Sequence, residues 1–155
     1  MIRNHLSSML VVLATLLCCA TMGQAQDSRT ESHLMVAMRM IGHEVLLNAG
    51  DSLSRVLPIE KVDDRYKIQF DTKFEFNPQE LATTVDRIVL ETGIADSYIV
   101  EVEACLTGEV VYSYEVGELI VPDGLACGTR AQPPACYTVL FTLLVPGESL
   151  AQLLA

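Results

Sequence analysis

Apolar residues in the first part of the chain recur in steps of three and four. From Ser32 onward they are Leu34, Met38, Ile41, Val45 and Ala49, with Met35 and Leu46 beside them. This spacing puts the side chains on one stripe of an α-helix and is typical of a helix that packs against a core. We expect the helix to end at Gly50, because glycine takes the left-handed conformation at no steric cost, and Asp51 to begin a loop.

The apolar pattern then changes from helical spacing to alternation. From Arg55 the alternating positions are Leu57 and Ile59, then Tyr66, Ile68 and Phe70, and finally Phe74 and Phe76 in a short extended piece. Asp63 and Asp64 are turn residues between the first two runs, so the pattern predicts a β-hairpin. Pro58 cannot donate to a strand ladder, which places the first strand at a sheet edge or the proline near its end.

The tetrapeptide Asn77-Pro78-Gln79-Glu80 predicts the start of a second helix. Asparagine is a preferred N-cap, proline suits the first helical position, and a glutamate at the third position can reach back to the cap. The apolar face that follows consists of Leu81, Val85, Ile88 and Val89. Gly93 is expected to end this helix, again as a C-terminal glycine.

Three further strands are predicted after the second helix. Residues 98–105 and 110–116 alternate between apolar and polar side chains, and Thr107-Gly108 between them suits a hairpin turn. Residues 137–145 are almost wholly apolar and rich in β-branched side chains, which is typical of a central strand. The predicted order is α-β-β-α-β-β-β. Its simplest packing is an α+β fold of two layers, a largely antiparallel sheet with both helices on one face.

The N-terminus has the three parts of a signal peptide. Arg3 lies in a short positive region, residues 9–17 form an apolar run, and Gly23-Gln24-Ala25 is a small-x-small exit. We expect cleavage after Ala25. The chain then divides into a signal peptide (1–25), a polar leader (26–31), a periplasmic α+β domain (32–146) and a short tail (147–155).

Two alternatives to cleavage stay open at this stage. Residues 6–23 approach the length of a membrane span, so an uncleaved segment would anchor the domain to the membrane. Cys18 and Cys19 follow an apolar run and raise the alternative of a lipidated N-terminus, although Leu17 is not the small residue usually found before such a cysteine. The expected location is therefore periplasmic or secreted, with membrane attachment only if this segment is retained or lipidated.

The charge of the chain argues against nucleic acid as a partner. The sequence has 10 basic and 20 acidic residues, and the first 25 residues contain one base, Arg3, and no acid. After cleavage 9 basic and 20 acidic residues remain, a net charge of -11. This surplus repels a polyanion, and no cluster of lysines or arginines offsets it locally.

Cysteines Cys105, Cys127 and Cys136 remain after cleavage, and an oxidising compartment preserves disulfides. Three cysteines allow one bridge and one spare thiol. We expect a bridge between Cys127 and Cys136, because the glycine and prolines between them suit a loop whose ends return close together. Cys105 would then be a small core residue. The spacing of these cysteines does not resemble that of a zinc site, and no histidine lies near them in the sequence.

Motifs of catalysis are not found in this sequence. His43-Glu44 lacks the second histidine one helical turn later that a zinc protease needs, since position 47 is leucine. No G-x-S-x-G elbow or phosphate-binding glycine cluster occurs. The acids that could work as a catalytic pair are Asp71, Glu75, Glu80, Glu101 and Glu103, and their spacing fits the solvated sides of strands and a helix start. We therefore expect no enzyme activity, no metal and no cofactor.

Five stretches carry a resemblance to a known family. They are RMIGHEVLL (39–47), GDSLSRVLPI (50–59), IVEVEAC (99–105), VVYSYE (110–115) and CGTRAQPPACY (127–137). Together they resemble the extracytoplasmic region of membrane-anchored winged-helix transcriptional regulators of Gram-negative bacteria. The resemblance covers about residues 37–145. It implies a periplasmic sensory or partner-binding module, which in those relatives precedes a transmembrane helix and a cytoplasmic DNA-binding domain.

Neither that span nor the DNA-binding domain occurs before Ala155. We therefore expect a sensor or interaction module, which is either a truncated regulator or a free-standing paralogue that keeps only the sensor. The second hypothesis is an envelope structural or small-ligand-binding protein. In either case we expect the partner, a protein or small molecule of the envelope, to meet the turn from Asp51 to Arg55 and the loop from Cys127 to Cys136. Arg130 lies in this loop, and the alternative for it is an ion pair with a surface acid. Constrained loops on a rigid sheet often carry binding, and the guanidinium of Arg130 suits a carboxylate.

Overall fold

The computed structural model describes residues 30–117 and 130–144. The predicted signal peptide, the tail from residue 147 and Cys127 lie outside the described residues. Residues 30–48 are helical, and the compact unit that carries the fold begins within this helix, at Met35. In the part of the chain that the structure describes, no helix combines the length and the apolarity needed to cross a bilayer.

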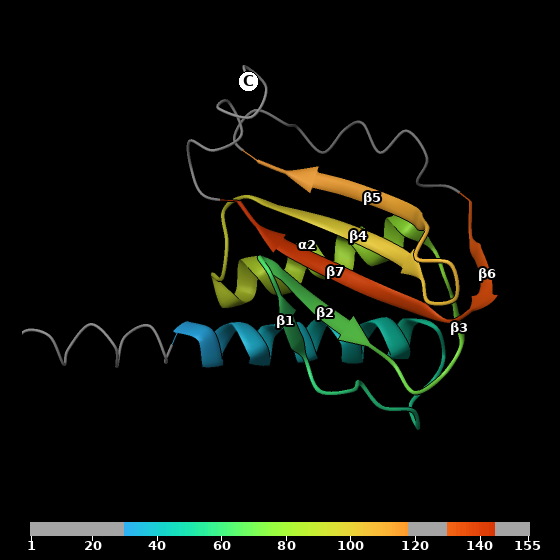
Figure 1. The fold of residues 1–155 in the computed structure, drawn as a ribbon. Coiled ribbons are helices and arrows are strands. Elements are labelled where there is room, and N and C mark those ends of the chain that lie inside the picture. The colour runs from blue at the N-terminus through green and yellow to red at the C-terminus, as the bar shows by residue number, and fades with distance from the viewer. Residues whose placement is uncertain (1–29, 118–129, 145–155) are drawn as a thin grey trace, which may run out of the picture. The chain divides into compact units, whose positions relative to one another are not determined.

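The main sheet has five strands in the order β1-β2-β7-β4-β5, and all neighbouring strands are antiparallel (Figure 1). The strands are β1 (Glu60–Val62), β2 (Arg65–Gln69), β4 (Tyr98–Ala104), β5 (Val110–Val116) and β7 (Tyr137–Leu143). β7 lies in the centre, between β2 and β4. This confirms the central strand that the apolar run predicted.

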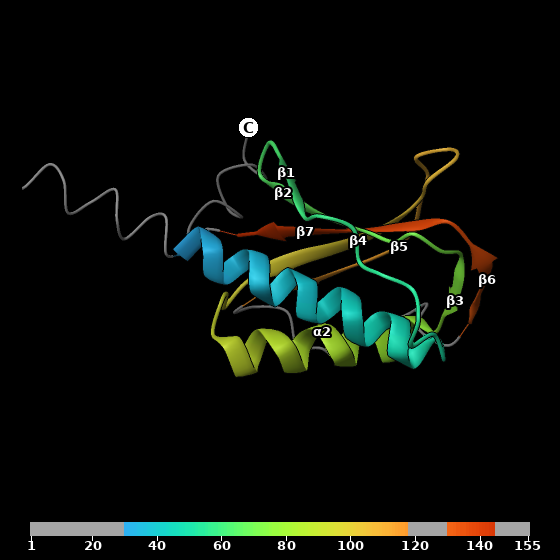
Figure 2. The same ribbon diagram turned by 90° about the horizontal axis from the view of Figure 1, so that it is seen from below.

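Both helices, the 30–48 helix and α2 (Pro78–Thr92), lie on one face of this sheet (Figure 2). Strand register brings buried side chains together in rows on that face. One row is Tyr66, Phe141 and Val100, and the next is Ile68, Val139 and Val102. The apolar stripes of the helices cover these rows, so the protein is the α+β sandwich of two layers that the sequence predicted.

The ends of α2 follow the residues that predicted them. The Asn77 side-chain oxygen accepts hydrogen bonds from the backbone N–H groups of Gln79 at 2.9 Å and Glu80 at 3.3 Å. Pro78 occupies the first turn, where its missing N–H is not needed. Gly93 has φ +63° and its N–H donates to the carbonyl oxygen of Val89. A glycine in this left-handed conformation ends the helix as expected.

The predicted hairpin is present, but its first strand is shorter than the alternation indicated. β1 begins at Glu60, whereas alternation starts near Arg55. Before Pro58 the chain touches β2 at the bridge of Val56 with Phe70 and at the 2.8 Å bond from the Leu57 N–H to the Gln69 oxygen. Proline has no N–H to offer, so the ladder is interrupted there and resumes at β1.

The structure contains a strand in a segment that the sequence predicts to be loop. β6 (Gln132–Ala135) pairs antiparallel with β3 (Phe74–Phe76) to form a second, two-stranded sheet. Phe74 lies opposite Ala135, and Phe76 lies opposite Gln132. β6 contains two prolines, which an edge strand tolerates because its outward N–H positions need no partner strand.

The disulfide joins Cys105 to Cys136, so the predicted bridge between Cys127 and Cys136 is wrong. The last paired residues of β4 and β7 are Ala104 and Tyr137. Their neighbours Cys105 and Cys136 continue this ladder, with a 3.0 Å bond from the Cys105 N–H to the Cys136 oxygen. Adjacent strands therefore hold the two Cα atoms 5.4 Å apart, a separation that suits a bridge.

This pairing also corrects the expectation for Cys105. It is exposed at the end of β4 and bonded to sulfur, and it is not a buried free thiol. Cys127 lies outside the described residues, between the two bridged cysteines in the sequence.

Candidate functional site

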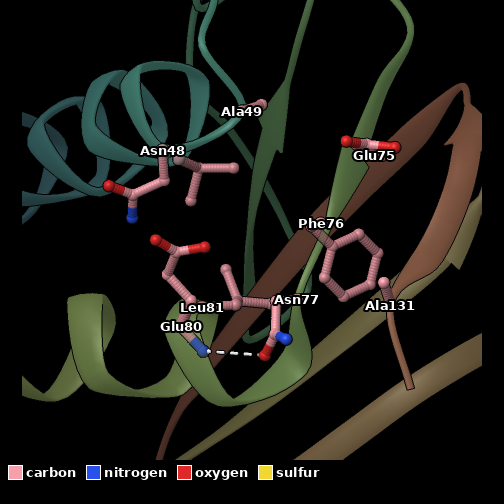
Figure 3. A pocket seen from close by; sticks show the side chains of 9 residues that line it. Asn48, Ala49, Glu75, Phe76, Asn77, Glu80, Leu81 and Ala131 are labelled. Carbon is pink, nitrogen blue, oxygen red and sulfur yellow. Dashed lines mark hydrogen bonds between the residues drawn. The ribbon is translucent and has the colours of Figure 1, made fainter. Parts of the chain in front are cut away.

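A pocket of about 140 Å³ lies where four segments of the fold meet (Figure 3). The segments are the end of the 30–48 helix, the end of β3, the start of α2 and the start of β6. The lining residues are Val45, Asn48, Ala49, Glu75, Phe76, Asn77, Glu80, Leu81 and Ala131.

The pocket has an apolar floor that the core holds in place. Val45, Phe76 and Leu81 are 4%, 7% and 3% exposed. The ring of Phe76 packs edge-on against Tyr137, with ring centres 5.1 Å apart. The phenol of Tyr137 in turn donates to the Pro133 carbonyl oxygen at 2.6 Å, which ties β6 to the central strand. The floor is therefore a rigid part of the molecule.

The rim of the pocket is polar. Asn48 donates from its amide to the hydroxyl oxygen of Thr84 at 2.8 Å, which links the two helices beside the pocket. Glu75 and Glu80 are exposed and line opposite parts of the rim. The Glu80 backbone N–H is held by the Asn77 cap, the bond drawn in Figure 3, while its carboxylate points towards Asn48. A group entering the pocket would meet apolar surface below and carboxylates above.

Asp51, one of the residues predicted to meet a partner, organises the turn after the 30–48 helix. Its carboxylate accepts hydrogen bonds from the backbone N–H groups of Leu53 and Ser54, both at 2.9 Å. Hydrogen bonds from Ser54 lower the pKa of the Asp51 carboxyl, and the bond from the Ser54 side chain has a larger effect than the bond from its backbone. This carboxylate is engaged in its own loop, two residues beyond Ala49 of the pocket lining.

Arg55 and Arg130, the other two predicted residues, lie in different settings. Arg55 is held by Asp71, through its backbone N–H at 2.8 Å and its side-chain Nε at 3.2 Å, and it does not line the pocket. Arg130 is exposed and directly precedes Ala131, a lining residue. The fold thus brings the segments of Asp51 and Arg130 to one pocket. Arg55 instead binds Asp71, which follows the second strand of the hairpin.

Glu101 and Glu103 do not share a face with the tyrosines of the next strand. Register places Tyr114 opposite Val100 and Tyr112 opposite Val102, so both tyrosines lie on the helix-covered face. The glutamates lie on the other face, where Glu101 is 3.7 Å from the guanidinium of Arg65. Both acids therefore lie half-buried on the sheet face away from the helices, and the tyrosines do not join them there.

Tyr98 and Tyr114 belong to a polar cluster between α2 and the sheet. The phenol of Tyr98 donates to an Asp86 carboxylate oxygen at 2.5 Å. Burial, followed by this bond to Asp86, raises the pKa of Tyr98 far above its usual value. Burial is also the main cause that raises the pKa of Tyr114. Both phenols stay protonated at physiological pH, which suits a structural contact between helix and sheet.

The pocket was not recognisable from spacing, because its lining comes from four separate segments. Asn77, which the sequence predicts as a helix cap, is one of the residues that line it. Among residues 30–117 and 130–144, no group of three or more His, Cys, Asp and Glu side chains could hold a metal ion. His43 is an exposed helix residue.

Comparison of the chain with protein-family models, with curated proteins and with solved structures finds no match.

Proposed function

We propose that this chain is a non-enzymatic sensor or interaction module of the bacterial periplasm, exported by residues 1–25. The observation that carries the proposal is the bridge between Cys105 and Cys136. A disulfide inside a small domain persists in oxidising compartments and is rare in the cytosol. The signal-peptide pattern of the N-terminus and the resemblance to periplasmic regulator domains agree with this location.

The pocket supports a binding role. Its volume of about 140 Å³ suits one side chain or a small molecule. The apolar floor and the carboxylates of Glu75 and Glu80 favour a group with an apolar body and a cationic or amide end. Arg130, beside the pocket, is free to meet a carboxylate of the same partner.

The settings of the titratable groups support a role without catalysis. Asp51, Asp71, Tyr98, Tyr114 and Tyr137 have displaced pKa values. Each serves a turn, an ion pair or the core, and none lines the pocket. An acid-base pair would instead need shifted groups that converge on one cavity.

Intact mass of the protein from its native envelope fraction tests the location. We expect a chain that begins at Gln26, with one thiol alkylated before reduction and three after it. That result fits a cleaved, bridged domain with Cys127 free. A mass that retains residues 1–25, or a lipid on Cys18 or Cys19, would replace the soluble module with a membrane-tethered one.

Site-specific photo-crosslinking tests the binding role. A photoreactive residue in place of Ala131 lies at the pocket, and one in place of Leu90, which is 84% exposed on α2, is the matched control. We expect one discrete adduct in the envelope from position 131 and none from position 90. The variant Ala49→Trp fills the pocket and should remove the adduct. An adduct that survives this substitution would contradict the pocket as the binding site.

A further inference from the structure

The 30–48 helix carries a second apolar stripe on the side away from the sheet. Val36, Met40 and Leu47 are 56%, 39% and 40% exposed although their side chains are large and apolar. His43 is exposed between the last two. At about 100° per residue, these four positions fall within roughly 60° of one another around the helix. They lie opposite the buried Ile41 and Val45.

The spacing within this outer stripe is that of a coiled-coil seam. Val36, Met40, His43 and Leu47 follow one another by four, three and four residues. Two helices that pair side by side bury positions with this alternation, named a and d, in a shared seam. Met40 and Leu47 take a positions, and Val36 and His43 take d positions. The core stripe of the same helix is already buried, so in the described part of the chain the outer stripe is the face of this helix left open to a second one.

Charges flank the outer stripe in a complementary way. Arg39 lies on one side of it, at a g position, and Glu44 lies on the other side, at the following e position. In a parallel, in-register pair, a g residue of one helix meets the e residue five positions later on the other. Arg39 is exposed and makes no ion pair among the described residues. Self-association would therefore place Arg39 of each copy beside Glu44 of the other.

Glu44 has the capacity for this second contact. One of its carboxylate oxygens, Oε2, is 3.3 Å from the Arg87 guanidinium of α2. The other oxygen is left for a second donor. An antiparallel pair would instead bring like flanks together, so that Arg39 faces Arg39 of the other copy. Charge therefore favours the parallel arrangement.

We propose that the protein forms a parallel homodimer through Val36, Met40, His43 and Leu47 of the 30–48 helix, with Arg39–Glu44 pairs between the two copies. The sheet packs against the opposite side of this helix, and α2 lies beside it at the Glu44 flank, where Glu44 meets Arg87. Within the described part of the chain the stripe itself stays exposed. The occupant of the stripe is a second copy of this chain, because the flanking charges of the helix complement themselves.

Sedimentation of the full chain, exported by its own N-terminal segment and recovered from the envelope, tests the proposal. We expect a reversible monomer–dimer equilibrium. Met40→Glu places a charge in the seam of each copy and should raise the dissociation constant roughly 100-fold. Leu90→Glu changes a leucine on α2 that is 84% exposed, against 39% for Met40, and should leave the constant within about twofold. Circular dichroism of each variant checks that it folds.

Charge exchange tests the predicted ion pairs. Arg39→Glu and Glu44→Lys should each weaken self-association roughly tenfold, because like charges then flank the seam. An equal mixture of the two variants should form heterodimers with an affinity within about threefold of the original, since both flanks regain opposite charges.

A cysteine variant can detect the dimer even when the two copies associate weakly, because a disulfide traps the pair. Met40→Cys should yield a disulfide-linked dimer in the envelope, because equivalent a positions face each other in a parallel pair. Leu90→Cys should not. A protein that stays monomeric at all concentrations, or a dimer that Met40→Glu and the charge variants leave unchanged, overturns the proposal. A monomer that binds phosphatidylglycerol vesicles through the same stripe also overturns it.

Discussion

Gly42 marks a close approach of the 30–48 helix to the chain beneath it. A Cβ atom at this position would lie 2.7 Å from Cγ2 of Ile68 and 2.9 Å from both Cγ atoms of Val56. Both neighbours are β-branched, and Ile68 is fully buried, so they have little freedom to move aside. The glycine is therefore required by packing, although it sits in the middle of a helix where it costs propensity.

Gly42→Ala sets these two effects against each other. Alanine gains about 1 kcal/mol of helix propensity, while overpacking a close contact costs about 1–3 kcal/mol. We expect a net loss of about 1 kcal/mol in the free energy of unfolding, measured by urea denaturation. In a Val56→Ala background, which removes two of the three obstructing atoms, the loss should shrink. A stabilising effect in both backgrounds would contradict the packing argument.

The ion pair of Arg55 and Asp71 predicts a dependence of stability on pH. The Arg55 N–H, aided by the guanidinium, holds the pKa of the Asp71 carboxyl below its usual value of 3.8. A carboxyl whose pKa is lower in the folded protein than in the unfolded chain stabilises the fold at pH values above the unfolded-state pKa. This stabilisation is lost as the pH falls through the folded-state pKa. Asp71→Asn should therefore lower the urea midpoint at pH 7 but have little effect near pH 2. Asp64→Asn, at an exposed turn, is the control, and equal effects of Asp71→Asn at both pH values would contradict the role of the charge.

At the scale of elements, local signals predicted most of the fold. Helix spacing, the Asn77 cap, the glycines at helix ends and the alternation of the two hairpins act within a few residues, so they can be seen in the sequence. β6 was missed because Pro133 and Pro134 are signals of loop. Its strand conformation depends on β3, a segment more than fifty residues earlier, and a partner at that distance leaves no local pattern. The pocket was missed for the same reason.

The start of α2 offers a test of one of these local signals. Asn77→Ala removes the oxygen that accepts from Gln79 and Glu80 and should cost about 1 kcal/mol in the free energy of unfolding. Asn77→Asp keeps an acceptor and places a negative charge at the helix N-terminus, so it should retain most of the stability. Gln79→Ala, at an exposed neighbour, is the control for general changes in this turn. Equal losses from alanine and aspartate would show that the cap oxygen is not what stabilises the helix.

At the scale of the whole molecule, the disulfide depends on topology that spacing does not reveal. Cys127 and Cys136 are closer in sequence, but Cys105 and Cys136 are closer in space because β4 and β7 are neighbours in the sheet. The bridge closes a loop with a sequence separation of 31 and fastens the central strand to its neighbour. The bridge thereby lowers the conformational entropy of the unfolded chain, and it also holds the end of the sheet together.

Removal of this bridge should be the largest single change in stability among those considered. For a loop of this length, the chain-entropy model gives about 3–4 kcal/mol, so the double variant Cys105→Ser/Cys136→Ser should lose stability of this order in urea denaturation. Reduction of the original protein should have an effect of similar size. Cys127→Ser is the matched control and should leave the free energy of unfolding unchanged. If Cys127→Ser were instead as damaging as the double variant, a bridge that includes Cys127 would hold the native fold, and the pairing of Cys105 with Cys136 would have to be abandoned.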